Sequence, residues 1–426
     1  MSETINIWIA VICTIGAIYG LIKRYETRFV LLLSGFLMAI LSLKPMIAFQ
    51  QFDKSMTRGS LIIAICSAIG FAAVISYTKC DVHLVRLLTK PLRKMGLFLL
   101  PACMVITSFI ATAIPSMSGL AASVAPTMIP ILVRAGFRPS MAAASIGACM
   151  MPAYFNPGVS HNPFISKLAN MNVMDFIMAH GSMTLGLGIA AIVLMTIVCV
   201  IYKDYRPEGF PDTEFAKNYQ DKGDGEFHVN VFYALAPIIP VALLVIVSLC
   251  FKGVKMSVAT AMLIGSMYAL IVTRTDPQEA TRKFFDGMGR GYGKILGIII
   301  AAGVFAAGLR ACGVIDLFVN YLTHANEVAK IGGSVGPFLL GLLTGSGDAA
   351  AFAFNEAVTP YAPQFGMTID GLGYLAMMSA GIGRMASPLA GGIILVSGVA
   401  MVSPVEVVKR TAPAAVVMLI GLYFFI

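Results

Sequence analysis

The sequence predicts an all-α polytopic membrane protein with two inverted repeats of five transmembrane helices, each carrying a re-entrant hairpin and a broken helix. Two observations lead to this fold class. Hydrophobic residues make up 58% of the 426 residues and charged residues 12%, whereas a soluble domain has about 25% charged residues. Apolar runs long enough to cross a bilayer also recur along the chain, in an order that the second half repeats.

The first repeat is expected at residues 1–202. Its full spans are predicted at about 5–22, 28–45, 60–79, 139–155 and 181–202. No basic stretch precedes the first apolar run and no convincing cleavage site follows it, so we expect it to stay as a transmembrane helix. Two shorter apolar pieces form a predicted hairpin at about 97–133, with the sequence PSMSG at its tip. The sequence NPGVSHNP then breaks the span that begins at 139.

The second repeat is expected at residues 231–426, after a polar, Pro- and Gly-containing linker at 203–230. Its full spans are predicted at about 231–251, 256–273, 290–312, 370–402 and 411–426. A second hairpin is predicted at about 332–363, with its tip at Gly345–Asp348. Ser387 and Pro388 interrupt the span that follows this hairpin.

The net charge of +9 is explained by the loops and does not indicate nucleic-acid binding. Most lysines and arginines between the spans fall on one side of the predicted topology, and such an excess marks the cytoplasmic side. This places the 203–230 linker in the cytoplasm and both termini outside. Because each repeat has an odd number of crossings, the two hairpins enter the bilayer from opposite sides.

Small polar residues at the hairpin tips and helix breaks form the predicted substrate site. Non-helical backbone at membrane depth persists only where it lines a protein-walled or watery cavity, and there its amides and carbonyls bind anions and Na⁺. In the alternative interpretation, glycine and serine only let helices pack closely; matched placement in both halves favours the site. The candidate substrate-binding residues are Ser116, Ser118, Gly119, Asn156, Pro157, Gly158, Thr344, Gly345, Ser346, Gly347, Arg384, Ser387 and Pro388.

Arg384 is the candidate carboxylate clamp, since a guanidinium holds a carboxylate through two parallel hydrogen bonds. The alternative is a structural salt bridge with Asp348 or Glu356. Two other cations fall inside apparent spans, where a lone charge is costly. Arg310 is either functional or extends to the end of its span, and Lys294 is interpreted as interfacial.

Asp348, Asn355 and Glu356 are the candidate residues for a coupling ion, either H⁺ or Na⁺. Asp348 has the alternative role of counter-charge to Arg384, and Glu356 that of a capping or pairing residue. His161 lies in the first break, where it either titrates during a proton-coupled step or faces solvent as a loop residue.

Enzyme chemistry has no support in the sequence. The eight cysteines are scattered without a CxxC pair, which disfavours a disulfide framework or a zinc site. No HExxH, GxSxG, P-loop or kinase motif occurs. We expect no enzyme activity, no cofactor and no metal site.

Several segments resemble the anaerobic C4-dicarboxylate carrier family, DcuC, of the ion transporter superfamily. These are LTGSGDA (343–349), GIGRMASP (381–388), SPVEVVKRT (403–411), AAGVFAAGL (301–309) and the stretch 118–144. The resemblance implies a homodimeric carrier of fumarate, succinate, malate or aspartate in the bacterial inner membrane, working by exchange or proton-linked efflux. Two departures are Asp348, where asparagine is frequent, and YFNPGVSHNP (154–163), where an Ala-Pro-Thr-Ser-like run is expected.

The predicted function is secondary active transport of C4-dicarboxylates, in which a hairpin-bearing unit moves like an elevator against a dimerising scaffold. The alternative within transporters is a carrier of another small organic anion, a monocarboxylate or amino acid, with Na⁺ coupling. An ion channel would show a pore-lining repeat without paired, opposed hairpins, a pattern that this sequence does not have.

Overall fold

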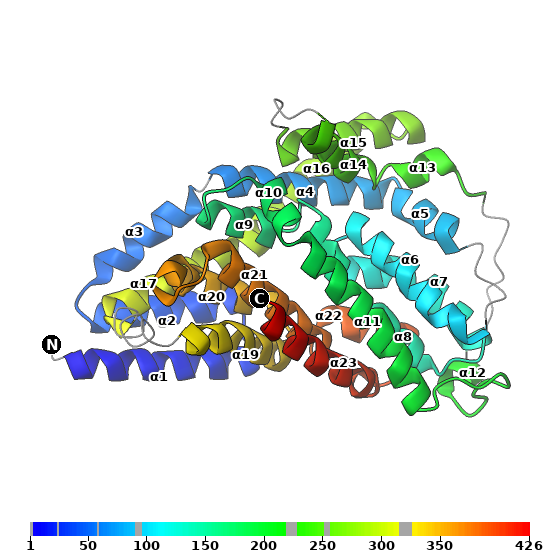
Figure 1. The fold of residues 1–426 in the computed structure, drawn as a ribbon. Helices are drawn as coiled ribbons and strands as arrows, with labels where there is room; N and C mark the ends of the chain where they lie inside the picture. Colours follow the sequence, from blue (N-terminus) through cyan, green and yellow to red (C-terminus); the bar gives the residue numbers. More distant parts are fainter. Residues whose placement is uncertain are drawn as a thin grey trace.

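The computed structural model describes residues 3–23, 25–57, 59–89, 96–218, 228–250, 256–314 and 326–426. These residues are helical throughout, apart from turns and one isolated β-bridge between Phe137 and Tyr205. Figure 1 shows the helices arranged in an elongated bundle in which α11 and α23 lie side by side.

The elements before the linker are α1 (Glu3–Ile22), α2 (Thr27–Leu41), α3 (Pro45–Met56), α4 (Gly59–Tyr77), α5 (Cys80–Thr89), η1 (Gly96–Phe98), α6 (Leu99–Ala113), α7 (Met117–Arg134), α8 (Pro139–Gly147), η2 (Met151–Phe155), α9 (His161–Leu168), α10 (Val173–Ala179) and α11 (Gly181–Ile201). The linker contains α12 (Glu214–Asn218). The elements after it are α13 (Val231–Leu235), α14 (Ile239–Cys250), α15 (Val258–Thr273), α16 (Pro277–Gly291), η3 (Tyr292–Leu296), α17 (Gly297–Ala311), α19 (Asn326–Thr344), α20 (Gly347–Ala357), η4 (Thr359–Phe365), α21 (Ile369–Met385), α22 (Gly391–Val399) and α23 (Pro404–Phe425).

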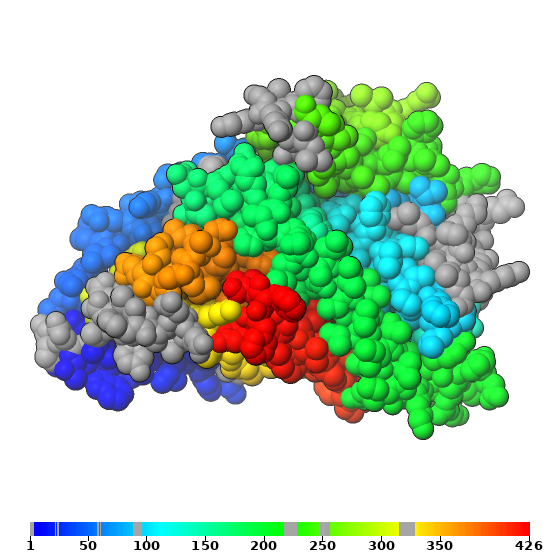
Figure 2. Space-filling view, viewed as in Figure 1, coloured from blue at the N-terminus to red at the C-terminus, as the bar shows by residue number. Residues whose placement is uncertain are grey.

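The outer surface is suited to lipid. In the part of the chain that the structure describes, six helices are long and apolar enough to cross a bilayer, or up to seven if α3 and α4, bent by 51°, form one span. Large apolar side chains such as Trp8, Ile201 and Phe424 are more than half exposed, which is costly in water and normal against lipid. Figure 2 shows α11 and α23 adjoining on the viewed face. The chain is therefore a multi-pass membrane protein by its surface as well as by its composition.

Two helical hairpins are present where the sequence predicts them. The first hairpin is α6 with α7, joined by residues 114–116, and the second hairpin is α19 with α20, joined by residues 345–346. The second begins at Asn326, six residues before its predicted start, and α20 ends at Ala357. Each arm of the first hairpin is long and apolar enough to cross a bilayer on its own.

Three predicted spans have other bounds in the structure, and the last of them, predicted at 411–426, begins at Pro404. The span predicted at 290–312 begins at Pro277, because Asp276 caps the helix by accepting from Gln278 N and proline suits the first helical position. The first turns of α16 are polar, so hydropathy alone did not reveal them. The span predicted at 231–251 is divided into α13 and α14 around Pro237, which has no backbone N–H for a continuous helix.

Glycines bring α16 and α17 against the first part of the chain. A Cβ on Gly287 would lie 2.8 Å from Gly70 Cα of α4, and one on Gly308 would lie 2.6 Å from Gly35 O of α2. Real Cβ atoms do not approach so closely, so these helices touch through their backbones, as small residues allow in membrane bundles. This packing fixes α4 and α16 as one wall of the cavity described below.

Candidate functional site

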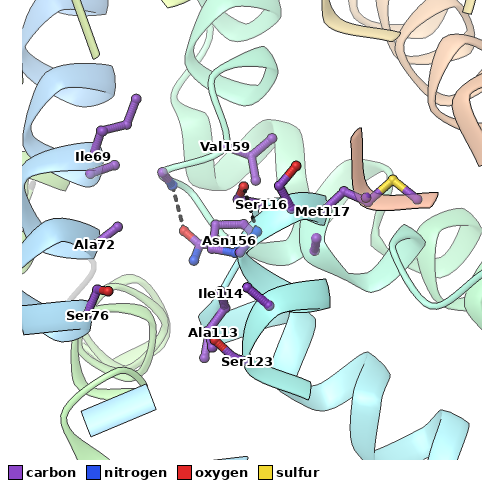
Figure 3. Close-up of a pocket in the computed structure, with 18 of the residues that line it drawn as sticks. Ile69, Ala72, Ser76, Ala113, Ile114, Ser116, Met117, Ser123, Asn156 and Val159 are labelled. Carbon is purple, nitrogen blue, oxygen red and sulfur yellow. Dashed lines mark hydrogen bonds between the residues drawn. The ribbon is translucent and has the colours of Figure 1, made fainter. Parts of the chain in front are cut away.

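A cavity of about 1060 Å³ lies where the hairpin tips and helix breaks meet. One wall is formed by α4 with α16 and η3, and the other by the two hairpin tips, the segment from η2 to α9, and residues on both sides of the second break. Figure 3 shows Ile69, Ala72 and Ser76 of α4 facing Ser116 and Asn156 across the space. The cavity is therefore lined by residues of both hairpin tips, of the first break and of the segments that flank the second break.

Both hairpin tips place a helix N-terminus at the cavity. Ser116 caps α7 by accepting from Gly119 N at 3.3 Å, and Ser346 caps α20 by accepting from Ala349 N at 3.4 Å. The serine side chain satisfies one amide, while the helix end keeps its partial positive charge. Each tip thus presents a serine-capped helix N-terminus to the cavity, which is a favourable environment for an anion.

Gly345 makes the second tip possible. Its φ of +71° is in the left-handed region, and a Cβ there would lie 2.6 Å from the carbonyl carbon of Leu389. Only glycine combines this backbone conformation with so close an approach. The tip of the second hairpin therefore rests directly on the backbone of the second helix break.

The first break is held together by asparagine side chains. Asn156 accepts from Gly158 N at 2.8 Å and donates to Thr112 O at 2.7 Å, while Asn162 donates to the carbonyls of Tyr154 (2.8 Å) and Asn156 (3.0 Å). These bonds replace the helical bonds lost at the break, which a buried backbone requires. They also attach the break to α6 of the first hairpin.

A charged group links the first break to the second hairpin. His161 Nε2 lies 3.1 Å from Asp348 Oδ1, and Arg384 Nη1 lies 3.4 Å from the same oxygen. The imidazole stacks on Phe352 with ring centroids 4.3 Å apart and is only 2% exposed. Of the two alternatives for His161, the solvent-facing loop residue is therefore wrong, because the side chain is buried against Phe352 of α20.

Arg384 retains capacity for a ligand. In the described part of the chain its guanidinium makes one hydrogen bond, from Nη1 to Asp348, and its side chain is 17% exposed at the cavity. A guanidinium has five N–H donors. The salt bridge with Asp348 and a bond to a ligand carboxylate are therefore compatible.

The cavity brings together nine of the predicted site residues. These are Ser116, Ser118, Gly119, Asn156, Gly158, Gly345, Ser346, Asp348 and Arg384. The other seven are not among the lining residues: Pro157, Thr344, Gly347, Asn355, Glu356, Ser387 and Pro388.

Most of the seven shape or support the tips and breaks. Thr344 accepts from Ser346 N at 3.1 Å, and Ser387 accepts from Leu389 N at 3.3 Å. Asn355 is fully buried, accepts from Thr359 Oγ1 at 2.7 Å and donates to Gly373 O. A role of Asn355 or Glu356 in ion coupling stays a prediction.

Arg310 lies away from the cavity. Its Nη2 donates to Gln51 Oε1 at 3.3 Å, so it joins α17 to α3, and it is not among the lining residues. This contact gives the arginine a packing role between two helices.

Several polar lining residues were not considered as substrate contacts from the sequence, among them Asp81, Arg86, Ser123, Arg290 and Lys294. Ser123 donates to Asp81 Oδ2 at 3.2 Å, and burial raises the pKa of the Asp81 carboxyl on α5. Arg290 was assigned to a loop and Lys294 to the interface, because the polar start of α16 was not recognised. The spacing of four residues between Arg290 and Lys294 was the available sign that they act together, since residues four apart share one face of a helix.

The charges on the cavity wall favour an anion. The lining includes four basic side chains, Arg86, Arg290, Lys294 and Arg384, and two acidic ones, Asp81 and Asp348. Among the residues that the structure describes, no three His, Cys, Asp or Glu side chains are grouped as metal ligands.

Broken helices, two hairpin tips and a basic cavity inside an apolar helical bundle define a membrane transporter. Comparison with known families then identifies which one. The chain belongs to the DcuC family, described as the C4-dicarboxylate anaerobic carrier, whose model matches residues 34–426. Because its relatives are transporters, the protein is not an enzyme.

Two curated relatives illustrate the range of similarity. A putative uncharacterized transporter of Haemophilus influenzae is 44% identical over 63% of this chain and 99% of its own length. The anaerobic C4-dicarboxylate transporter DcuC of Escherichia coli K12 is 25% identical over 100% of this chain and 96% of its own. The similarity to a named dicarboxylate transporter therefore extends over the full length.

Among solved structures, the YdaH transporter of Alcanivorax borkumensis has a similar fold. It superposes with a TM-score of 0.61, covering 88% of this chain and 86% of its own, at 12% sequence identity. At this identity the likeness concerns the fold alone.

Proposed function

We propose that the protein is a secondary active transporter of C4-dicarboxylates, such as fumarate, succinate, malate or aspartate, in the bacterial inner membrane. The observation that carries this proposal is the single cavity at which both hairpin tips and both helix breaks converge, with basic side chains in excess. A transporter needs a binding site at its broken helices, and family membership supports a dicarboxylate as its substrate.

One substrate carboxylate binds between Arg384 and the hairpin tips. The remaining guanidinium donors of Arg384 and the N-termini of α7 and α20 supply hydrogen bonds and positive charge. Hydroxyls of Ser116 and Ser346 complete the pocket. Removing a dianion from water is costly, so several such groups acting together are required.

Asp348 couples transport to a cation. One of its carboxylate oxygens contacts both His161 and Arg384. A substrate carboxylate that binds Arg384 therefore weakens the salt bridge between Arg384 and Asp348. A proton or Na⁺ at Asp348 then compensates the charge that the substrate brings. Coupling to H⁺, coupling to Na⁺ and exchange of two acids are the three modes to be separated.

Alternating access is elevator-like. The hairpins and broken helices form the mobile unit, and the wall of α4 and α16 belongs to a scaffold through which two copies dimerise. The cavity lies between these two sets of helices, which is where a substrate would be when one set slides past the other. The proposal includes two inverted repeats, at 1–202 and 231–426, with the 203–230 linker in the cytoplasm and both termini outside.

Uptake into proteoliposomes tests the proposal. The purified protein is given a panel of labelled four-carbon diacids, monocarboxylates and amino acids, with pH and Na⁺ gradients varied separately. Saturable uptake of a diacid supports it. Uptake of only a monocarboxylate or amino acid would replace it with the broader organic-anion carrier, and non-saturable ion flux would indicate a channel.

A further inference from the structure

We propose that Arg290 and Lys294 bind the second carboxylate of the substrate and thereby make the site select diacids over monoacids. The inference rests on the proposed function and adds two specificity residues to it. Both side chains line the cavity that holds Arg384 and the hairpin tips, but they come from the opposite wall.

The helix geometry turns both side chains toward the cavity. Gly287 and Gly291 occupy the side of α16 that packs on α4, where Cβ atoms would lie 2.8 Å from Gly70 Cα and 3.2 Å from Cys66 Cα. Arg290, near the end of α16, and Lys294, in η3, are exposed, line the cavity and lie four residues apart. They therefore present two cations together.

A π-helical turn fixes the position of Lys294. Residues Tyr292–Leu296 form this turn, and the carbonyl of Gly293 accepts a hydrogen bond from Arg28 Nη1 at 2.6 Å. Single π turns within α-helices are frequent at functional sites, because the extra residue re-aims the side chains around it. Arg28 of α2 thus anchors the turn next to the lysine.

Charge balance favours these two cations, because the other lining charges, Arg384 with Asp348 and Arg86 with Asp81, are equal in number and opposite in sign. Arg384 already forms a salt bridge with Asp348, so these two side chains together contribute little net charge to the cavity. None of the ion pairs between described residues involves Arg290 or Lys294. A monoanion is matched by the donors of Arg384 and the tips, whereas a dianion brings a second charge that must also be compensated when water is displaced.

Two basic residues on the same helix provide a control. Arg282 and Lys283 both pair with Glu279, at 2.7 and 3.3 Å, and neither lines the cavity. If the basic residues of this helix served only to orient the protein in the membrane, all four would be equivalent for transport. The specificity proposal instead predicts that only Arg290 and Lys294 affect the selection of diacids.

The experiment measures competition against labelled succinate uptake in proteoliposomes. The competitors are unlabelled succinate and succinamate, its monoamide, which has nearly the same shape and one negative charge fewer. Wild-type uptake of labelled succinate is established first, because its absence would refute the proposed function and not this inference. The variants are Arg290→Gln, Lys294→Gln, Arg282→Gln and Lys283→Gln, each reconstituted with the same orientation and amount.

Arg290→Gln and Lys294→Gln should each weaken inhibition by succinate about tenfold or more, the scale of a lost hydrogen bond to a charged group. Inhibition by succinamate should stay within about twofold, because its single charge is bound at Arg384. Arg282→Gln and Lys283→Gln should behave as wild type for both competitors, and Arg290→Lys and Lys294→Arg should retain most of the selectivity. Equal weakening of both competitors, or no weakening of either, would overturn the proposal.

Discussion

The imidazole of His161 lies 3.1 Å from the carboxylate of Asp348, although 187 positions separate these residues in the chain. The contact joins the break that follows α8 to the tip of the second hairpin, and Arg384 of α21 binds the same carboxylate oxygen. Three segments from distant parts of the sequence therefore meet at one charged group. Any movement that separates these segments must break the contacts of Asp348 with His161 and Arg384, so we expect the three segments to move together.

Replacing Arg384 tests the carboxylate clamp. Arg384→Lys keeps the charge but loses the planar fork, so the apparent affinity for diacids should fall about tenfold or more. Arg384→Ala should abolish the rise in melting temperature that substrate produces, because a ligand stabilises only the state that binds it. Transport by Arg384→Lys with unchanged apparent affinity would show that the arginine is not the clamp.

Replacing Asp348 tests ion coupling. Asp348→Asn removes a negative charge that both His161 and Arg384 contact, so the dependence of uptake on pH or on Na⁺ should change more than the melting temperature does. Uptake at a fixed substrate concentration, measured over a pH series with and without Na⁺, gives the answer. Normal uptake with the same ion dependence as wild type would make Asp348 a structural residue.

Asp204 should be essential for stability and not for substrate recognition. It is 1% exposed, accepts hydrogen bonds from Arg410 Nε at 2.5 Å and Nη2 at 3.0 Å, and forms an ion pair with Arg138, whose Nε lies 2.8 Å away. Asp204→Ala should lower the free energy of unfolding by about 3–5 kcal/mol, since the buried Arg410 loses the two bonds to Asp204 and keeps only those of Nη1 to Glu406. Asp212→Ala, at an exposed position in the same loop, is the control, and equal melting temperatures of the two variants would contradict the expectation.

Thiol labelling tests the predicted topology. In a cysteine-free background, single cysteines within 203–218 should be shielded from an impermeant reagent in intact cells, because the basic loops lie in the cytoplasm. A cysteine near Lys252, in a segment outside the described residues, should react. Equal labelling at the two places would end the inverted-repeat model.

The hairpins and breaks could be predicted because their composition is unusual. Gly345, Ser346 and Asp348 within an apolar run, like Asn156 and Pro157 after another, are out of place in a continuous membrane helix. The structure has a hairpin tip or a break at each of these points. Such local signals are visible in a single sequence.

Other parts of the site could not be predicted from local signals. The pairing of His161 with Asp348 depends on how distant segments pack, and no periodicity encodes it. Arg290 was assigned to a cytoplasmic loop because the first turns of α16 are too polar for a hydropathy pattern, although Asp276 and Pro277 are a helix-start signal. The charged residues on the opposite wall were therefore missed, while nine of the residues predicted at the tips and breaks line the cavity.

The asparagine bonds at the first break have a consequence for how fast the protein can work. Asn156 and Asn162 hydrogen-bond Gly158 N and the carbonyls of Tyr154 and Asn156 within this segment, and Thr112 O of α6. The segment is therefore preorganised for the proposed site, because the conformational entropy that a flexible loop would lose on binding a ligand has already been lost in folding. Binding and release of a small acid then require little reordering of the first break, which suits a carrier that must release its substrate in every transport cycle.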